Sequence, residues 1–183
     1  MRVITGLAKG KSLITAEGLD VRPTPDRVKE GMFSSIQFDL EGRRVLDLFA
    51  GSGQLGIEAL SRGAEYALFV DSSPVSVKNI NKNLENTGFT DNSKVIRGDF
   101  EAVLLGLNEK FDFVFLDPPY ASSFLLRALK LVQKNVALNG KIFCEHPSSL
   151  ELPEEIDDFV KQKSYRYGKI IVCVFGRKCD DNE

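Results

Sequence analysis

The sequence is poor in the residues that build metal sites, disulfide frameworks and membrane spans. It has one histidine, which argues against a histidine-based metal site, and its 3 cysteines are widely spaced and match no CxxC pattern. We therefore expect reduced thiols, with Cys144 and Cys173 in the core, and a cytoplasmic protein. No apolar run approaches the roughly 20 residues of a membrane helix. The N-terminal stretch MRVITGLAKGKS also lacks the apolar core of a signal peptide.

A strong net charge is absent too, because 24 Lys and Arg residues nearly balance 26 Asp and Glu residues. A net charge of −2 argues against a surface that coats nucleic acid broadly, so any contact with a polyanion has to be local. Positive charge does gather near the N-terminus. The basic residues there are Arg2, Lys9, Lys11, Arg22, Arg27 and Lys29.

What the sequence does have is an alternation of apolar strands and helices from about residue 44 onwards. Four strand–helix pairs precede a fifth strand, GKIFCEH, and a terminal hairpin, FVKQKSYRYGKIIVCVF. The pattern predicts an α/β fold whose seven-stranded, mostly parallel sheet carries helices on both faces and a C-terminal antiparallel hairpin. The strands are RVLDLF, ALFVD, KVIRGD and DFVFLD, with helices over about 53–62, 74–86, up to 105, and 124–136.

The first 40 residues form an extension before this domain, which we expect to cover 41–183 with a disordered tail from about residue 177. Within the extension, RVITG and KSLIT are β-branched runs separated by LAKGK, which predicts a hairpin. The stretch VRPTPDRVKEGMFSSIQF predicts a helix with Thr24 as its N-cap and Pro25 in the first position.

A glycine loop, DLFAGSGQLG, follows the first strand of the domain and matches GxGxxG at Gly51, Gly53 and Gly56. Taken alone it is a tight turn that many α/β proteins need. Asp71, at the end of the second strand, lies 20 residues beyond Gly51, where an acid accepts hydrogen bonds from ribose hydroxyls. An adenosine-containing ligand, NAD or S-adenosylmethionine, is therefore expected. Asp47, just below the loop, would repel a pyrophosphate but attract an α-amino group, which favours S-adenosylmethionine.

Two further strand ends carry candidate side chains. The third strand ends in Asp99 and Phe100, which are placed to address an adenine amino group and flank its ring, although Phe100 fits the core equally well. The fourth ends in VFLDPPY, where two prolines hold the chain stiff beside Asp117 and Tyr120. Because ligands bind beyond the carboxyl ends of parallel strands, these residues are expected to share one site.

The motifs VLDLFAGSG, FVDSS, GDF and LDPPY, in this order, resemble those of class I S-adenosylmethionine-dependent methyltransferases. The tetrapeptide DPPY is similar to that of members that methylate exocyclic or amide nitrogens. Four longer stretches resemble the RsmD family, whose members methylate N2 of one guanine in bacterial 16S ribosomal RNA. The resemblance runs from Met1 to about Phe175, and its stretches are MRVITGLAKGKSL, RPTPDRVKEGMFS, LDLFAGSGQLGIEALSRGA and YGKIIV.

The resemblance implies S-adenosylmethionine as cofactor and a monomer that acts on 16S ribosomal RNA, within a 30S subunit or an assembly intermediate. Catalysis would fall to Asp117 and the Pro118 carbonyl, which accept the two N–H bonds of the guanine amine, while Tyr120 stacks on the flipped base. The expected cofactor residues are Asp47, Gly51, Gly53, Asp71, Ser72, Asp99 and Phe100. The expected RNA-binding residues are Arg2, Lys9, Lys11, Arg22 and Arg27.

Two other functions remain open at this point. An adenine-N6 methyltransferase acting on DNA or RNA would use the same tetrapeptide geometry, but the chain shows no second domain that could read a DNA groove. A nucleotide-binding module without catalysis, or an NAD enzyme, would explain the glycine loop. That hypothesis leaves DPPY without a role.

Overall fold

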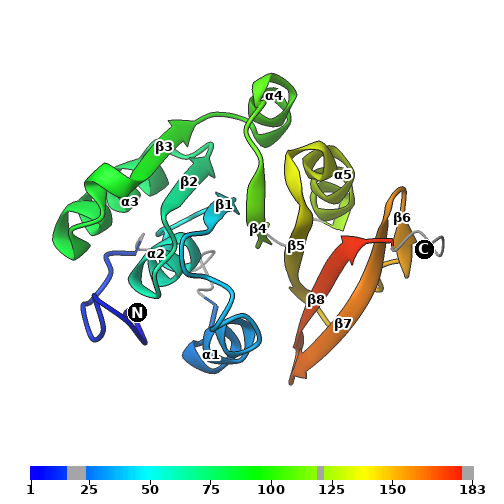
Figure 1. The fold of residues 1–183 in the computed structure, drawn as a ribbon, viewed down its shortest axis with the longest axis horizontal. Helices are drawn as coiled ribbons and strands as arrows, with labels where there is room; N and C mark the ends of the chain where they lie inside the picture. The colour runs from blue at the N-terminus through cyan, green and yellow to red at the C-terminus, as the bar shows by residue number, and fades with distance from the viewer. Residues whose placement is uncertain (16–23, 119–121, 179–183) are drawn as a thin grey trace.

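A computed structural model describes residues 1–15, 24–118 and 122–178, and within these ranges the chain forms one eight-stranded sheet covered by helices (Figure 1). The strand order is β3-β2-β1-β4-β5-β8-β7-β6. The strands are β1 (Arg44–Leu48), β2 (Tyr66–Asp71), β3 (Ser93–Arg97), β4 (Phe111–Leu116), β5 (Val136–Pro147), β6 (Glu155–Ile156), β7 (Phe159–Tyr167) and β8 (Ile170–Arg177). The helices are α1 (Asp26–Ser34), α2 (Gln54–Ser61), α3 (Pro74–Thr87), α4 (Phe100–Gly106), α5 (Ser122–Val132) and the 3₁₀ turns η1 (Thr90–Asn92) and η2 (Gln133–Asn135).

The sheet confirms the predicted α/β class. Strands β1 to β5 pair in parallel, and β8 and β7 add the expected antiparallel hairpin. The predicted seven strands are joined by an eighth, the two-residue β6, which pairs with β7 and is too short to leave a periodic pattern. Arg177, near which the disordered tail was expected to begin, still belongs to β8, and residues 179–183 lie outside the described ranges.

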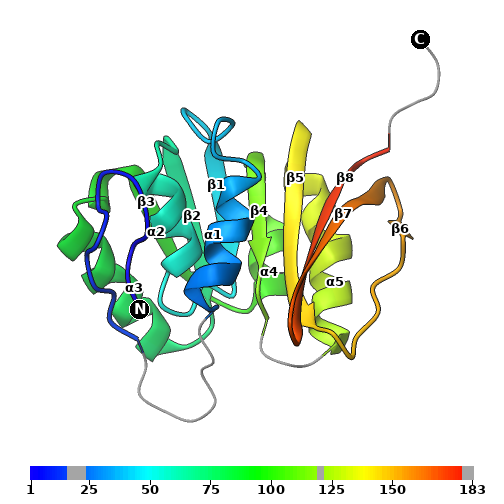
Figure 2. The same ribbon diagram turned by 90° about the horizontal axis from the view of Figure 1, so that it is seen from below.

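Helices cover both faces of the sheet (Figures 1 and 2). One face is packed by α1, α2 and α3 through one cluster of buried side chains, and the other by α4 and α5 through a second cluster. Cys144 and Cys173 lie in the second cluster, as the sequence predicts. No helix in the described ranges is long and apolar enough to cross a membrane.

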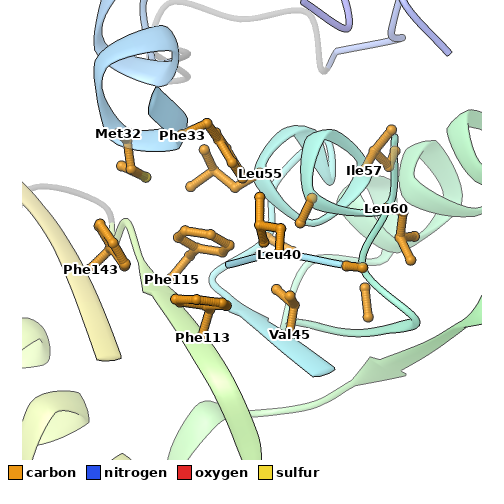
Figure 3. Close-up of a cluster of buried hydrophobic side chains, with 14 of the residues drawn as sticks. Met32, Phe33, Leu40, Val45, Leu55, Ile57, Leu60, Phe113, Phe115 and Phe143 are labelled. Carbon is orange, nitrogen blue, oxygen red and sulfur yellow. The ribbon is translucent and has the colours of Figure 1, made fainter. Parts of the chain in front are cut away.

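Aromatic side chains join the N-terminal extension to the core of the sheet (Figure 3). Phe33 of α1 packs against Phe115 of β4 with ring centroids 5.3 Å apart, and Phe115 in turn packs against Phe143 of β5 at 5.6 Å. All three rings are buried. The extension thus shares its hydrophobic core with the sheet, and burial of each such ring stabilises the contact by about 1.5–3 kcal/mol.

The N-terminal hairpin is less regular than expected. A single bridge pairs Arg2 with Ser12, and the N–H of Val3 donates to the carbonyl of Lys11 at 2.9 Å. The segment packs beside α2 and α3 (Figure 2). There Asn83 of α3 exchanges two hydrogen bonds with the backbone of Ile14.

A buried carboxylate, that of Glu58 on α2, fixes the extension to the domain. It accepts hydrogen bonds from the N–H groups of Ile4 at 2.8 Å and Thr5 at 3.1 Å, and from the Arg62 Nε at 2.8 Å. The Lys29 Nζ lies 3.6 Å from the same carboxylate and donates to the carbonyl of Arg2 at 2.7 Å. The side chains of Lys29 and Glu58 are both fully buried. Lys29, one of the basic residues of the N-terminal segment, is therefore a buried partner of Glu58 and not a surface charge.

Removing this carboxylate should destabilise the whole chain. In Glu58→Ala the Lys29 ammonium stays buried without its counter-charge, and two backbone N–H groups lose their acceptor, which together cost about 3–5 kcal/mol. Urea unfolding measures the change in the free energy of unfolding. The matched control is Glu30→Ala, which removes an exposed glutamate from α1 and should leave stability within about 0.5 kcal/mol. Equal stability of the two variants would contradict the anchoring role of Glu58.

Candidate active site

A pocket of about 760 Å³ opens at the carboxyl ends of the parallel strands. Ligands bind at this edge in open α/β sheets. The segments that follow β1, β2, β3, β4 and β5 all contribute to its wall, and so does the turn between β7 and β8. The predicted site residues found in the lining are Gly51, Asp71, Ser72, Asp99, Phe100, Asp117 and Pro118.

Asp71 holds together two of the loops that line the pocket. Its Oδ2 accepts a hydrogen bond from the N–H of Gly51 at 2.8 Å, and its Oδ1 accepts one from the N–H of Ser73 at 2.9 Å. Gly51 has φ +58°, and a Cβ built there meets no atom within 4 Å. The loop therefore leaves open space beside an acid, and each carboxylate oxygen keeps a second lone pair for a ribose hydroxyl.

The rest of the glycine loop packs against the protein. A Cβ on Gly56 would lie 2.3 Å from the Phe69 ring, so only glycine lets α2 approach β2 this closely. The Oδ2 of Asp47 accepts a hydrogen bond from the N–H of Gly56 at 2.8 Å, and burial raises the pKa of Asp47 well above its usual value. Neither Asp47 nor Gly53 is among the lining residues, so the structure gives Asp47 a partner within the protein rather than in the pocket.

Two phenylalanines form an aromatic wall of the pocket. The rings of Phe49 and Phe100 have centroids 5.0 Å apart. Phe100 lines the pocket and also belongs to the core, the two positions that the sequence allowed for it. Asp99 caps α4, because its Oδ1 accepts hydrogen bonds from the N–H groups of Glu101 and Ala102. Phe49 has φ +67°, a strained conformation for this residue type, and no sequence signal marks it.

Asp117 stands where β4 ends, at the middle of the pocket, with Pro118 beside it in the lining. Its Oδ2 accepts a hydrogen bond from the hydroxyl of Thr24 at 3.1 Å. The surrounding protein disfavours the charged carboxylate and raises the pKa of Asp117 to about 6, while the Thr24 hydroxyl acts in the opposite direction. Pro119 and Tyr120 lie outside the described residues.

Thr24 is the functional candidate that sequence reasoning missed. The expected N-cap role is wrong, because α1 begins at Asp26 and the residue at its N-cap is Pro25, with no side-chain hydrogen bond. Thr24 is buried and its hydroxyl is directed at Asp117, 93 residues away in the chain. A contact over that sequence separation leaves no local pattern to detect.

His146 lines the far side of the pocket, but both ring nitrogens face protein atoms. Nδ1 lies 3.0 Å from the carbonyl of Pro147, and Nε2 lies 3.3 Å from the Sγ of Cys173. Burial lowers the pKa of His146. The ring is therefore neutral and held in place, in keeping with the structural role expected from the sequence.

Comparison with known proteins places the chain in a family. The family model described as Conserved hypothetical protein 95 matches residues 1–176. The chain belongs to this family. It is 40% identical to a Bacillus subtilis protein named "Putative rRNA methyltransferase YlbH", over 97% of this chain and 100% of that one. It is 35% identical to the "Ribosomal RNA small subunit methyltransferase D" of Haemophilus influenzae, over 79% and 78% of the two chains.

Solved structures agree with this membership. The "Putative methyltransferase yhhF from Escherichia coli" superposes with a TM-score of 0.88 at 27% identity, covering 97% of this chain and 98% of that chain. These likenesses confirm the RsmD-like resemblance and the class I methyltransferase fold. The protein is a methyltransferase.

In this member of the Conserved hypothetical protein 95 family, the described residues among the predicted RNA contacts lie on the N-terminal hairpin and on α1. Arg2 is exposed and its Nε lies 3.5 Å from Asp26 at the start of α1, and Arg27 is exposed on the same helix. Lys9 and Lys11 are exposed on the hairpin, where Ser12, next to Lys11, pairs with Arg2, and the Lys11 Nζ donates to the carbonyl of Asn86 near the carboxyl end of α3.

The tip of the hairpin packs against the carboxyl end of α2. This helix starts at the pocket with Gln54 and ends at Ser61, whose carbonyl accepts the N–H of Leu7 at 2.8 Å. Arg22 lies outside the described residues. Among those described, no group of His, Cys, Asp or Glu side chains could hold a metal ion.

Replacing Thr24 should change the titration of Asp117. Thr24→Val keeps the shape but removes the only donor the side chain has, so the pKa of Asp117 should rise by about 1 above its value near 6. Carbon NMR of the Asp117 carboxyl measures the pKa directly. Thr24→Ser retains the hydroxyl and should restore the original titration. An unchanged titration in Thr24→Val would show that the hydroxyl does not act on this carboxylate.

Proposed function

We propose that this methyltransferase transfers a methyl group from S-adenosylmethionine to the exocyclic N2 amine of one guanine in 16S ribosomal RNA. The observation that carries the proposal is the position of Asp117 and Pro118 in the same pocket as Asp71 and the glycine loop. Relatives whose names state action on small-subunit ribosomal RNA support this substrate.

The described residues fit the cofactor. The pocket offers an acid for a ribose diol at Asp71, open space over Gly51, and aromatic surface at Phe49 and Phe100 for a purine ring. When bound, S-adenosylmethionine supplies an electrophilic methyl group. The residues that we assign to cofactor binding are Asp71, Ser72, Gly51, Asp99 and Phe100. Asp47 and Gly53, which were also predicted to contact the cofactor, would instead shape the glycine loop.

Asp117 performs the activation of the guanine amine in this proposal. The amine lone pair is delocalised into the ring, so the nitrogen is a poor nucleophile until its N–H groups are held by fixed acceptors. Thr24 occupies one face of Asp117 and orients the carboxylate, which leaves acceptor capacity for the amine. With a pKa of about 6 the group is ionised at neutral pH, yet it takes up a proton more readily than an ordinary aspartate.

Pro118 directly follows Asp117 in the pocket lining. The Pro118 carbonyl is the second acceptor that the proposal requires, and the predicted stacking by Tyr120 falls on a residue outside the described ranges. After transfer the nitrogen carries the methyl group and loses one proton, which Asp117 accepts or passes to water. A base inside a helix cannot enter such a pocket, so the target must be unpaired or flipped out.

The proposal also covers where the enzyme works, the form of its RNA substrate and the basic residues that contact it. We infer that the enzyme works as a cytoplasmic monomer. We also infer that its substrate is a 30S subunit or an assembly intermediate, because a chain with little net charge needs the shape of its substrate for specificity. Arg2 and Arg27, near the pocket, would contact RNA phosphates close to the target. Lys9 and Lys11, on the hairpin that also carries Arg2, would contact RNA that reaches the carboxyl ends of α2 and α3.

Loss of the Asp71 carboxylate should weaken cofactor binding. Asp71→Ala removes a charged acceptor for the ribose hydroxyls and releases the Gly51 loop, so the dissociation constant for S-adenosylmethionine should rise at least tenfold, or about 1.5 kcal/mol or more. Calorimetry measures it. Asp91→Ala, at an exposed position on η1, should bind normally. Equal affinity of the two variants for S-adenosylmethionine would show that Asp71 does not bind the cofactor.

Changes at Asp117 should separate binding from chemistry. Asp117→Ala should abolish turnover while cofactor affinity stays near normal, and Asp117→Asn should retain part of the activity if the position of the acceptor matters more than its charge. Labelled S-adenosylmethionine and undermodified 30S subunits, free 16S RNA or DNA provide the assay, and digestion identifies the methylated nucleoside. N2-methylguanosine in RNA supports the proposal, whereas N6-methyladenine would replace it with the alternative activity.

A further inference from the structure

The charges that line the pocket are unevenly placed. Four lining side chains are acidic, namely Asp71, Asp99, Asp117 and Glu145. Among the described lining residues, Lys169 is the one lysine or arginine. A pocket with this balance suits the positive charge of a sulfonium cofactor, and Lys169 gives its lining one cationic side chain that attracts a phosphate.

Lys169 lies on the opposite side of β4 from the proposed cofactor residues. It sits in the turn between β7 and β8, directly before Ile170, which pairs with Pro147 at the end of β5. The carbonyl of Lys169 accepts the N–H of Ser148 at 2.8 Å, which ties the turn to the segment after β5. Because β4, β5 and β8 are neighbours and strands lie about 4.8 Å apart, β8 is about 10 Å from the strand that carries Asp117.

We propose that Lys169, with the hydroxyl groups of Ser148 and Ser149, forms a subsite for a phosphodiester of the RNA strand next to the flipped guanine. The inference rests on the proposed function and adds the place where the backbone of the target nucleotide is held. Ser148 and Ser149 line the same part of the pocket, and serine hydroxyls and lysine ammonium groups are common donors to phosphate oxygens.

The two contacts of the proposed subsite lie at the ends of different strands. The base would lie against Asp117 and Pro118 beyond β4, and the adjacent phosphate would meet Lys169 at the rim, beside the end of β5. Lys169 is exposed, so its ammonium can meet a phosphate without first leaving a buried partner. The hydrogen bond from the N–H of Ser148 to the carbonyl of Lys169 holds the turn in position, so the place of Lys169 relative to the base pocket is fixed.

This subsite differs from the basic residues of the N-terminal segment. Arg2, Arg27, Lys9 and Lys11 approach from the face of the sheet covered by α1, α2 and α3, whereas Lys169 belongs to the C-terminal hairpin. A phosphate at Lys169 fixes the orientation of the target nucleotide itself. Contacts to the N-terminal residues would fix the position of the surrounding RNA.

Steady-state kinetics with undermodified 30S subunits and labelled S-adenosylmethionine test the subsite. Lys169→Ala should raise the KM for subunits about three- to tenfold and reduce the slope of log(kcat/KM) against log[salt] by about 0.7, the contribution of one phosphate in single-stranded RNA. The turnover rate at saturating subunits and the dissociation constant of S-adenosylmethionine should stay as in the wild type. Lys169→Arg keeps the charge and should stay close to the wild type.

The matched control is Lys163→Ala, which removes an exposed lysine from the same hairpin, on β7 and outside the pocket lining. Its KM and salt dependence should not change. An equal effect of the two substitutions would mean that the hairpin acts only through diffuse charge, and no effect of either would mean that Lys169 contacts no phosphate; both results overturn the subsite. If the wild type forms no N2-methylguanosine in 16S RNA, the proposed function itself fails.

Discussion

The arrangement of the active site depends on one buried carboxylate, that of Glu58. It accepts the N–H groups of Ile4 and Thr5 and pairs with Lys29 and Arg62, so it joins the N-terminal segment, α1 and α2 in one cluster. With α1 fixed in this way, Thr24, two residues before it, reaches Asp117 at the carboxyl end of β4. The described part of the N-terminal extension thereby shares a core with the sheet and contributes a residue to the pocket region.

Strand β4 divides the pocket into two halves with different chemistry. On the side of β1, β2 and β3 the wall consists of the glycine loop, aromatic rings and Asp71, which suits an adenosine with a cationic sulfur. On the side of β5 and β8 it consists of serines, Glu145, a neutral histidine and Lys169. Asp117 stands between them at the end of β4, and in the proposed reaction the methyl group crosses there. The parallel sheet imposes this order, because successive strand ends meet at one edge.

Much of the site could be predicted from local sequence. Residues at strand ends, such as Gly51, Asp71, Asp99 and Asp117, came together because parallel strands bring their carboxyl ends to one edge. Local sequence could not reveal partners that are distant in the chain. Thr24 had the residue type and position of a helix cap, yet it donates to Asp117. Lys29 lies in a basic segment, and only its contact with Glu58 on α2 shows that it is buried.

The sequence by itself determined the α/β class, the strand-end motifs and the family, because hydrophobic periodicity and short motifs are local properties. Tertiary structure alone decided where single polar side chains point. Asp47 could face a ligand or a backbone N–H. Only the close approach of α2 at Gly56 shows that its carboxylate accepts the N–H of Gly56. Likewise Lys169 acquires its place in the pocket through strand pairing between β5 and β8, a contact between segments that no local pattern encodes.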